Sequence, residues 1–291
     1  MSASVAIRPA PSRAAADLPP GYTNGCHLDQ SRTTPRGCVY GDKRAKRTIT
    51  LVGDSKARQW LPTLDRYGKA AKWRIVAHTK SACPFTQAAV PQARTGRRYV
   101  SCARWNDRVL SRLRRDRPRV VVVALYAKYA LASRTATTTE QRQAAMAQGM
   151  RASWRSVTKG GSELVVLNST PYIGMPYRRH PTWLASACVA AHRTRTGLCD
   201  VPAAKALSGP AVWTPQDRDR VLTGLDDVHL IDLNPRLCSS RTCRVVLGHV
   251  LVYRDTHHLT ATVARRLYPY LRNRLTPLLS QRSRQASSAS S

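Results

Sequence analysis

Residues 48–60 read TITLVGDSKARQW, and this stretch decides the fold class. The run from Thr48 to Val52 is β-branched or aliphatic, as in a strand covered on both faces. A Gly-Asp-Ser turn follows, and a helical pattern begins at Ser55. In open parallel α/β sheets, ligands and chemistry gather at the carboxyl ends of the strands. Backbone N–H groups at a helix N-terminus also favour developing negative charge. The stretch therefore predicts a parallel α/β fold, with Ser55 as a candidate nucleophile.

Strand-like runs and helical patterns alternate along the rest of the chain. Besides Thr48–Val52, strands are expected at Arg74–His78, Arg119–Leu125, Glu163–Leu167 and Val228–Leu233. Helices are expected from Ser55 to about Ala71, at Ala103–Arg115, at Thr138–Val157, and from an N-cap at Thr260 onward. This alternation predicts one three-layer α/β domain with a mainly parallel sheet of about five strands. The stretch Tyr172–Asp226 is expected to form a loop-rich excursion over the active-site end.

Both ends of the chain have a low-complexity composition. Residues 1–20 are rich in Ala, Pro and Ser, and residues 280–291 read SQRSRQASSASS. Segments of this kind bury too little apolar surface to offset the entropy lost on ordering. We therefore expect a disordered N-terminal segment over 1–20, one domain over 21–279 and a disordered Ser-rich tail over 280–291.

The chain is strongly basic: its 291 residues include 48 Lys or Arg against 16 Asp or Glu, a formal net charge of +32. Such an excess predicts attraction to polyanions, whether nucleic acid, anionic lipid headgroups or acidic cell-wall polymers. The basic residues are spread almost throughout, however. There is no zinc-finger spacing, no basic region leading into heptads and no aromatic platform for single strands. An anionic polymer is thus a partner class to consider, whereas no specific nucleic acid is expected.

The eight cysteines are an even number and fall in local pairs along the chain. None shows the close Cys-x-x-Cys spacing of a structural zinc site, and no metal is expected. Local disulfides would suit an oxidising compartment. Eight cysteines allow 105 connectivities, so the pairing stays open, although loop closure favours near neighbours; eight free thiols are the alternative. Against export, the chain shows no secretory signal and no apolar run of ~18 residues that could span a membrane.

A second polar cluster, YRDTHHLT at Tyr253–Thr260, lies about 200 residues after Ser55. A serine nucleophile needs a base, and the base needs an orienting carboxylate on its other nitrogen. Asp255 and His258 are three residues apart in a turn, so one loop can supply both partners. Alone, they would be interpreted as a loop cap and a surface histidine. Together with the Gly-Asp-Ser turn, they predict a Ser–His–Asp group.

The joint pattern resembles the SGNH (GDSL-like) hydrolase superfamily. It is most similar to the extracytoplasmic SGNH domain attached to bacterial acyltransferase-3 membrane proteins, which O-acylate cell-envelope carbohydrates. The resemblance covers about residues 20–275. The matching segments are GCH…CVYGD ending at Asp42, TLVGDSKARQWLPTL (Thr50–Leu64), TKSACP (Thr79–Pro84), CARWNDRVL (Cys102–Leu110), IDLNPRLCSSRTC (Ile231–Cys243) and YRDTHHLT (Tyr253–Thr260).

The resemblance implies a flavodoxin-like SGNH-hydrolase fold in an extracytoplasmic location. It implies Ser55 as nucleophile, His258 as general base and Asp255 as the residue that orients the base. No cofactor is expected; the implied partners are a carbohydrate or other hydroxyl acceptor and a multi-span membrane acyltransferase that delivers the acyl group. It also implies four disulfides: Cys26–Cys38, Cys83–Cys102, Cys188–Cys199 and Cys238–Cys243.

The sequence departs from the family pattern beside the nucleophile and at the oxyanion site. The family usually has His after Gly-Asp-Ser, and this chain has Lys56. The third strand ends Ala124-Leu125-Tyr126 where many relatives have Asn, and Asn168 follows the fourth strand instead. The oxyanion donors expected here are the Ser55 backbone N–H and, as an outside candidate, Asn168.

The function that these residues favour is serine-dependent acyl transfer on cell-envelope carbohydrate. The reaction would pass through a covalent acyl-serine, with a sugar hydroxyl as acceptor in a transferase or water in an esterase. The alternative is a catalytically silent Arg-rich domain that binds anionic envelope polymers. A nucleic-acid-binding protein is a third interpretation, which rests on net charge alone.

Overall fold

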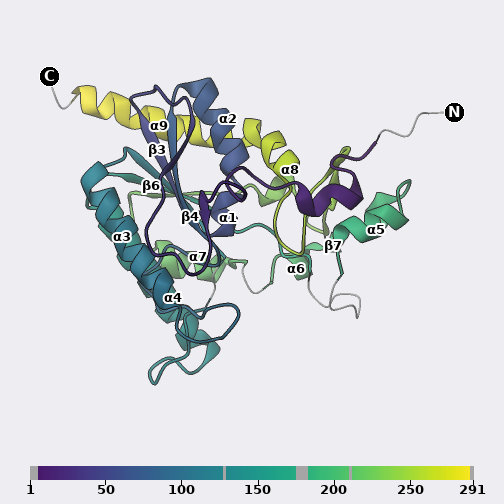
Figure 1. Ribbon diagram of the computed structural model, residues 1–291, viewed down its shortest axis with the longest axis horizontal. Coiled ribbons are helices and arrows are strands. Elements are labelled where there is room, and N and C mark those ends of the chain that lie inside the picture. Colours follow the sequence, from purple (N-terminus) through teal and green to yellow (C-terminus); the bar gives the residue numbers. More distant parts are fainter. Residues whose placement is uncertain (1–5, 127–128, 175–182, 210–211, 289–291) are drawn as a thin grey trace.

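The computed structural model describes residues 6–126, 129–174, 183–209 and 212–288, and a seven-stranded sheet forms its middle layer (Figure 1). Its strand order is β1-β4-β3-β5-β6-β8, and β2 pairs antiparallel with β4 on the edge that β1 also uses. The other pairings in this sheet are parallel. The strands are β1 (His27–Leu28), β2 (Cys38–Gly41), β3 (Thr48–Gly53), β4 (Arg74–Lys80), β5 (Val120–Ala124), β6 (Glu163–Leu167) and β8 (Val228–Ile231).

The mainly parallel α/β architecture is confirmed, and the five expected strands are β3, β4, β5, β6 and β8. The sheet has two strands more than expected, β1 and β2. They are only two and four residues long, so neither shows a detectable alternation of apolar and polar residues. Both add to the free edge of β4, where the Cys26–Cys38 disulfide joins their starting points.

Helices cover both faces of the sheet. Side chains alternate along each strand, so Ile49 and Leu51 of β3 join one core cluster and Val52 joins the other. The first core cluster includes side chains of α2 (Leu61–Ala71), α8 (Ala261–Arg266) and α9 (Tyr268–Ser288). The second includes side chains of α3 (Val100–Asp116) and α4 (Thr139–Thr158). The molecule therefore has the three layers that the alternation predicted.

Two expected helices are each broken in two. The helix expected over 55–71 is divided into α1 (Ser55–Arg58) and α2, and Pro62 lies in the first turn of α2. The helix expected from Thr260 is divided into α8 and α9, with Pro269 as the second residue of α9. Proline has no N–H to donate to the carbonyl four residues earlier, so a helix ends before it or restarts around it. Thr260 does cap α8, because its side chain accepts a hydrogen bond from the Val263 N–H at 3.1 Å.

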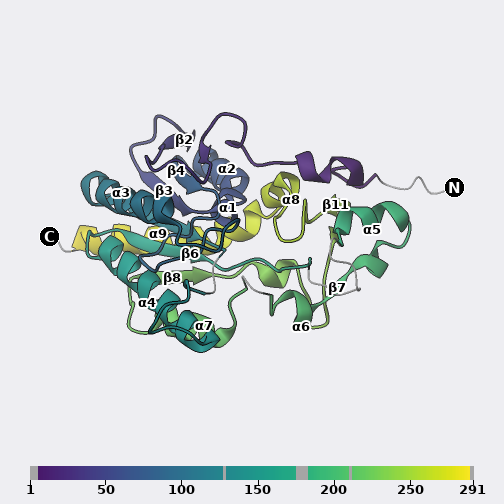
Figure 2. The same cartoon turned by 60° about the horizontal axis from the view of Figure 1, so that its bottom comes forward.

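The excursion after β6 contains short elements rather than loops alone. Figure 2 shows α5, β7 and α6 to one side of the sheet, away from α3 and α4. The described elements there are α5 (Ala185–Ala191), η2 (Thr196–Cys199), β7 (Val201–Pro202), α6 (Ala203–Ala206) and α7 (Pro215–Leu222). After β8 follow η3 (Asn234–Arg236), β9 (Thr242–Cys243), β10 (Val246–Leu247) and β11 (Val250–Leu251). Residues 175–182 and 210–211 of the expected excursion lie outside the described residues.

Parts of both ends that composition predicts to be disordered form helix, whereas residues 1–5 and 289–291 lie outside the described residues. Residues 11–16 form a 3-10 helix, η1 (Pro11–Ala16), and Ala14 within it is 1% exposed. Arg8 exchanges backbone hydrogen bonds with His249 and Leu251, and the Asp17 carboxylate accepts from the Thr262 N–H at 2.9 Å. Composition alone cannot predict these contacts, because they join the N-terminal segment to the last third of the chain. At the other end, α9 continues through Ser288 because Arg, Gln and Ala are good helix formers.

All eight cysteines are paired as the resemblance implied, in the disulfides Cys26–Cys38, Cys83–Cys102, Cys188–Cys199 and Cys238–Cys243. The Cys83–Cys102 bond lies fully buried in the second core cluster and ties α3 to the loop after β4. Among the described residues, no helix is both long enough and apolar enough to cross a bilayer.

We expect the disulfides to differ in their contribution to stability. Cys83–Cys102 closes a sequence separation of 19 residues and Cys238–Cys243 one of only 5. Loop-closure entropy gives about 3 kcal/mol for the longer loop and about 2 kcal/mol for the shorter one. Replacing both Cys83 and Cys102 by Ala should therefore lower the free energy of unfolding in urea more than the same change at Cys238 and Cys243. Equal losses, or a larger loss at Cys238 and Cys243, would contradict the expectation.

Candidate active site

The Gly-Asp-Ser turn lies where β3 ends beside the carboxyl end of β5. Gly53 is paired with Ala124 in the sheet and has φ +144°. A Cβ at this position would lie 2.2 Å from the Ala124 carbonyl oxygen and 2.9 Å from the Ala57 Cβ. Only glycine fits this close approach, which lets the chain turn directly from the strand into α1.

Asp54, the middle residue of the turn, is buried and holds the turn in place through hydrogen bonds. Its side chain is fully buried; Oδ1 accepts a hydrogen bond from the Lys56 N–H at 2.8 Å, and Oδ2 accepts one from the Tyr126 N–H at 2.6 Å. Burial raises the pKa of Asp54 to about 6, although these backbone hydrogen bonds and Lys56 lower it. One carboxylate thus caps α1 and joins it to the segment after β5.

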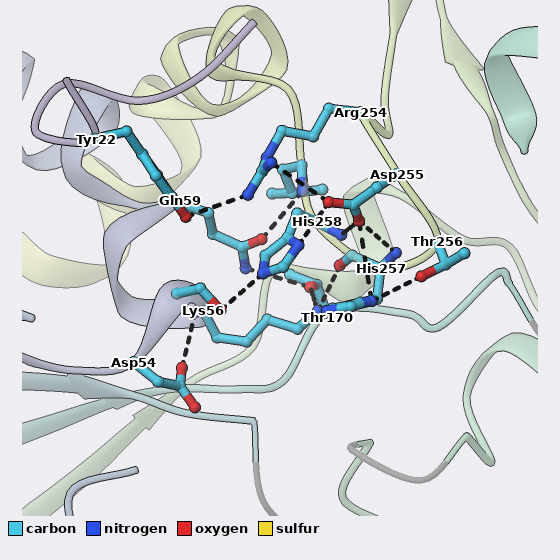
Figure 3. A network of polar contacts seen from close by, with 12 residues as sticks. Tyr22, Asp54, Lys56, Gln59, Thr170, Arg254, Asp255, Thr256, His257 and His258 are labelled. Carbon is cyan, nitrogen blue, oxygen red and sulfur yellow. Dashed lines mark hydrogen bonds and ion pairs between the residues drawn. The ribbon is translucent and has the colours of Figure 1, made fainter. Parts of the chain in front are cut away.

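Ser55, His258 and Asp255 lie in a hydrogen-bonded row. The Ser55 Oγ is 2.8 Å from His258 Nε2, and His258 Nδ1 is 2.7 Å from Asp255 Oδ2. The two partners come from the loop before α8, which lies against α1 in Figure 3. Because Nδ1 faces a carboxylate, it carries the proton, and Nε2 presents its lone pair to the serine hydroxyl. The sequence predicted this juxtaposition across a separation of 203 residues.

The Asp255 carboxylate is held from several sides. Its Oδ1 accepts hydrogen bonds from the His257 and His258 N–H groups at 2.9 and 2.8 Å, and Arg254 Nη1 lies 3.4 Å from Oδ2. Burial alone would raise the pKa of Asp255, but the hydrogen bond with His258 and these other contacts bring it below its usual range. Arg254 also donates to the Tyr22 hydroxyl at 3.2 Å. The carboxylate is therefore ionised and fixed in place at neutral pH.

The His258 imidazole is neutral at neutral pH. Burial lowers its pKa, the hydrogen bond and charge of Asp255 raise it, and the positive charges of Lys56 and Arg254 lower it; the net shift is downward. A neutral imidazole can accept a proton from the serine, which is the state that a general base requires.

Lys56, the residue that departs from the family pattern, connects α1 to two other segments. Its side chain is 1% exposed, and Nζ donates to the Thr170 Oγ1 at 2.8 Å and to the His257 carbonyl oxygen at 2.5 Å (Figure 3). Burial lowers its pKa to about 7, against the fields of Asp255 and Asp54. The ammonium group therefore holds the catalytic loop and the segment after β6 against the turn that carries Ser55.

Gln59 makes a second bridge between the same segments. Its Nε2 is 3.3 Å from the Thr170 Oγ1, and its Oε1 accepts a hydrogen bond from the Leu259 N–H at 3.0 Å. Gln59 and Thr170 were not singled out from the sequence, because residues separated by 111 positions give no local pattern. The one sequence feature that could have pointed to Gln59 is its position four residues after Ser55.

The second histidine of the loop lies beside the row, with its ring centroid 4.1 Å from that of His258, and it makes no hydrogen bond to Ser55 within the described residues. The His257 ring stacks on Tyr172 with centroids 5.4 Å apart and an interplanar angle of 7°, and it lies 4.9 Å from the Tyr126 ring. Its Nδ1 is 2.9 Å from the Thr256 Oγ1. Burial, reinforced by Lys56, lowers the pKa of His257, so this ring is also neutral. His257 thus forms an aromatic cluster with Tyr126 and Tyr172 beside the His258 ring.

Asn168 is not brought into the row. Its Oδ1 accepts a hydrogen bond from the Ser169 N–H at 2.9 Å, and the residue lines a cavity of about 450 Å³ together with Trp213 and Asn234. Within the described part of the chain, no hydrogen bond joins Asn168 to Ser55, His258 or Asp255. The Tyr126 N–H, at the position after β5, is already bonded to Asp54.

One group of side chains has the composition of a metal site. Ligand atoms of Asp255, His257 and His258 all lie within 4.8 Å of one another. Two of these residues are already bonded to each other, Asp255 Oδ2 with His258 Nδ1, and His257 Nδ1 faces Thr256. A metal bound through His258 Nδ1 would replace the hydrogen bond to Asp255, and one bound through Nε2 would replace that to Ser55, so the geometry favours proton transfer over metal coordination.

Comparisons with known proteins agree with the fold and the motifs. The family model described as SGNH domain (fused to AT3 domains) matches residues 25–273. Among solved structures, the fold is similar to the periplasmic domain of a lipopolysaccharide acetyltransferase from Salmonella ser. Paratyphi A. The TM-score is 0.56 over 87% of each chain, at 13% sequence identity. No curated protein sequence matches this chain. At so low an identity, the structural likeness establishes the fold alone.

Titration of the His258 ring by NMR tests the electrostatics of this site without any substrate. We expect its pKa to lie below 6.5 in the wild type. Lys56→Gln keeps a hydrogen-bond donor but removes the charge that lowers the His258 pKa, so this pKa should rise measurably.

The matched control is Lys159→Gln, which removes the same charge from an exposed position at the end of α4. This variant should leave the His258 pKa at its wild-type value. An unchanged or lowered His258 pKa in Lys56→Gln would show that the Lys56 charge does not act on the imidazole.

Proposed function

This chain belongs to the family of SGNH domains that are fused to AT3 domains, and on that basis we propose that it is a serine-dependent acyltransferase or esterase. The observation that carries the proposal is the row formed by Ser55, His258 and Asp255, with hydrogen bonds of 2.8 and 2.7 Å. Nucleophile, base and orienting carboxylate are all within hydrogen-bond reach, as covalent catalysis at a serine requires.

The reaction begins when the Ser55 Oγ attacks the carbonyl carbon of an acyl donor. His258 Nε2 takes the serine proton as the new oxygen–carbon bond forms, and then gives that proton to the leaving group as the old bond breaks. The product is an acyl-serine. In the second half, His258 takes the proton of an incoming hydroxyl, whose oxygen attacks the acyl carbon, and the proton returns to Ser55. Asp255 stays ionised and stabilises the imidazolium that forms in each half.

Negative charge develops on the acyl oxygen in both halves and needs hydrogen-bond donors. The Ser55 backbone N–H, at the start of α1, is our first candidate donor. Asn168 stays the second candidate: its NH₂ group would be the donor, while its Oδ1 keeps the hydrogen bond from the Ser169 N–H. Tyr126 is a poorer candidate, because its N–H is held by Asp54.

The acceptor that we propose is a hydroxyl of a cell-envelope carbohydrate, and the acyl donor is supplied by a multi-span AT3 membrane domain. Two observations support this assignment. The family consists of domains fused to AT3 domains, and the similar Salmonella structure is the periplasmic domain of a lipopolysaccharide acetyltransferase. Four disulfides support an extracytoplasmic location, where thiols are not kept reduced.

Labelling with a serine-directed fluorophosphonate tests whether Ser55 is an activated nucleophile. We expect labelling of the wild type at Ser55 and none of Ser55→Ala, because only a serine with a base at hydrogen-bond distance attacks the phosphorus rapidly. Mass spectrometry of the labelled peptide locates the adduct. If the wild type is not labelled although it is folded, the chain is the catalytically silent domain instead.

Hydrolysis of a small aryl acetate separates the roles of the two partners. His258→Ala should lower kcat by at least about 100-fold, the range that general-base catalysis supplies. Asp255→Asn should lower it by a comparable or smaller factor, because the base remains but loses its orienting carboxylate. His192→Ala, an exposed histidine after α5, is the matched control and should retain wild-type kcat. Full activity of His258→Ala would refute its role as the base.

A further inference from the structure

An arginine-lined cavity lies apart from the serine, between η3 and the junction of α8 with α9. Its volume is about 640 Å³. Arg236 of η3, Arg244 before β10 and Arg266 at the end of α8 line it, and all three are exposed. Arg274 of α9 lines an adjoining cavity of about 430 Å³, which shares Arg236 and Tyr270 with the first.

These guanidinium groups are not neutralised by carboxylates. The lining of the larger cavity contains no Asp or Glu, and within the described residues Arg236, Arg244 and Arg266 form no ion pair. Asp232, in the smaller cavity, is 3.7 Å from Arg218 instead. Asp200 accepts a hydrogen bond from the Val245 N–H; Arg244 influences its pKa but does not lie within ion-pair distance. Three positive charges therefore face one concave surface without a counter-charge.

The rest of the lining is apolar and aromatic. The Tyr270 ring lies 4.2 Å beneath the Arg236 guanidinium and is 36% exposed, and Leu247 and Pro269 contribute aliphatic surface. Guanidinium groups bind carboxylate and phosphate oxygens bidentately, and an exposed aromatic ring offers a flat apolar surface. Repulsion among three like charges is relieved when an anion enters. A ligand that has both anionic groups and a hydrophobic sugar face matches this lining.

We propose that this cavity is a binding site for an anionic carbohydrate segment, one that carries carboxylate or phosphate groups. It is a second site, distinct from the acyl-transfer centre. The loop that carries Asp255 and His258 ends just before the N-terminus of α8, and Arg266 is the last residue of α8. The length of this helix, about 9 Å, therefore separates the loop from the arginine. The site goes beyond the proposed function, because binding here needs neither Ser55 nor an acyl donor.

Binding of fluorescent oligosaccharides tests the site, at about 150 mM salt so that diffuse attraction to the +32 surface is screened. Three probes of equal length distinguish the chemistry: an oligogalacturonate for carboxylates, a phosphorylated dextran oligomer for phosphates and a neutral dextran oligomer. We expect at least one anionic probe to bind and the neutral probe to bind at least tenfold more weakly. Binding of neither anionic probe, or equal binding of the neutral one, would overturn the proposal.

Two triple variants with the same net charge locate the binding. The first replaces Arg236, Arg244 and Arg266 by Gln, and we expect its affinity for the anionic probe to fall at least tenfold. The matched control replaces Arg97, Arg98 and Arg104 by Gln, three exposed arginines in and before α3. This control should lose less than threefold. Equal losses in the two triples would show that binding is diffuse and that the cavity is not a site.

Further variants separate a loss of binding at the cavity from a loss of folding or of the catalytic serine. If the cavity triple unfolds, as judged by circular dichroism, Arg266→Gln against Arg104→Gln repeats the comparison, with a loss of threefold or more expected only for Arg266→Gln. Ser55→Ala should bind the anionic probe as tightly as the wild type does, although it is not labelled by the fluorophosphonate. Failure of the cavity and failure of the catalytic assignment are thereby distinguishable.

Discussion

The buried carboxylate of Asp54 holds together the segments on which the position of Ser55 depends. It receives the N–H of Lys56 from α1 and the N–H of Tyr126 from the segment after β5, while Gly53 lets the chain pass within van der Waals reach of Ala124. A buried charge is tolerated only where hydrogen bonds replace its lost hydration. These two bonds therefore stabilise the carboxylate and define the turn at once. A serine on a turn held in this way has little freedom to leave its base.

Lys56 holds the loop that supplies His258, as Asp54 holds the turn that supplies Ser55. Its ammonium group is buried between Thr170 and the His257 carbonyl, so it joins the start of α1 to the loop before α8 and to the segment after β6. The same charge disfavours protonation of both histidines of the loop. Lys56 therefore holds this loop in place and favours the neutral form of its two imidazoles. Lys56 thus contributes to both the position and the protonation state of the base, beside the hydrogen bond to Asp255 and the burial that lowers the His258 pKa most.

Much of the fold and the row of catalytic candidates could be predicted from the sequence, because both rest on local signals. The β3–turn–α1 stretch, the five principal strands, the Thr260 cap and the Asp255–His258 spacing each occupy a few adjacent residues. What could not be predicted depends on contacts between distant residues that carry no recognisable motif, unlike the pair of Ser55 and His258. Arg8 pairs with the chain at 249–251, and Lys56 meets Thr170 across 114 residues. No periodicity or composition encodes such a contact, and the short edge strands β1 and β2 depend on β4 in the same way.

The excess of basic over acidic residues limits how many positive charges can be paired with a carboxylate. With 16 acidic residues for 48 basic ones, most cations have no carboxylate available, and several lie over aromatic rings instead, as Arg47 does over Trp73 and Arg66 over Tyr268. On a convex surface such charges are solvated and screened independently of one another. In a concavity they share one small volume, and their fields add where a ligand would enter. The cavity of Arg236, Arg244 and Arg266 therefore differs in kind from the rest of the basic surface, although its residues are of the same type.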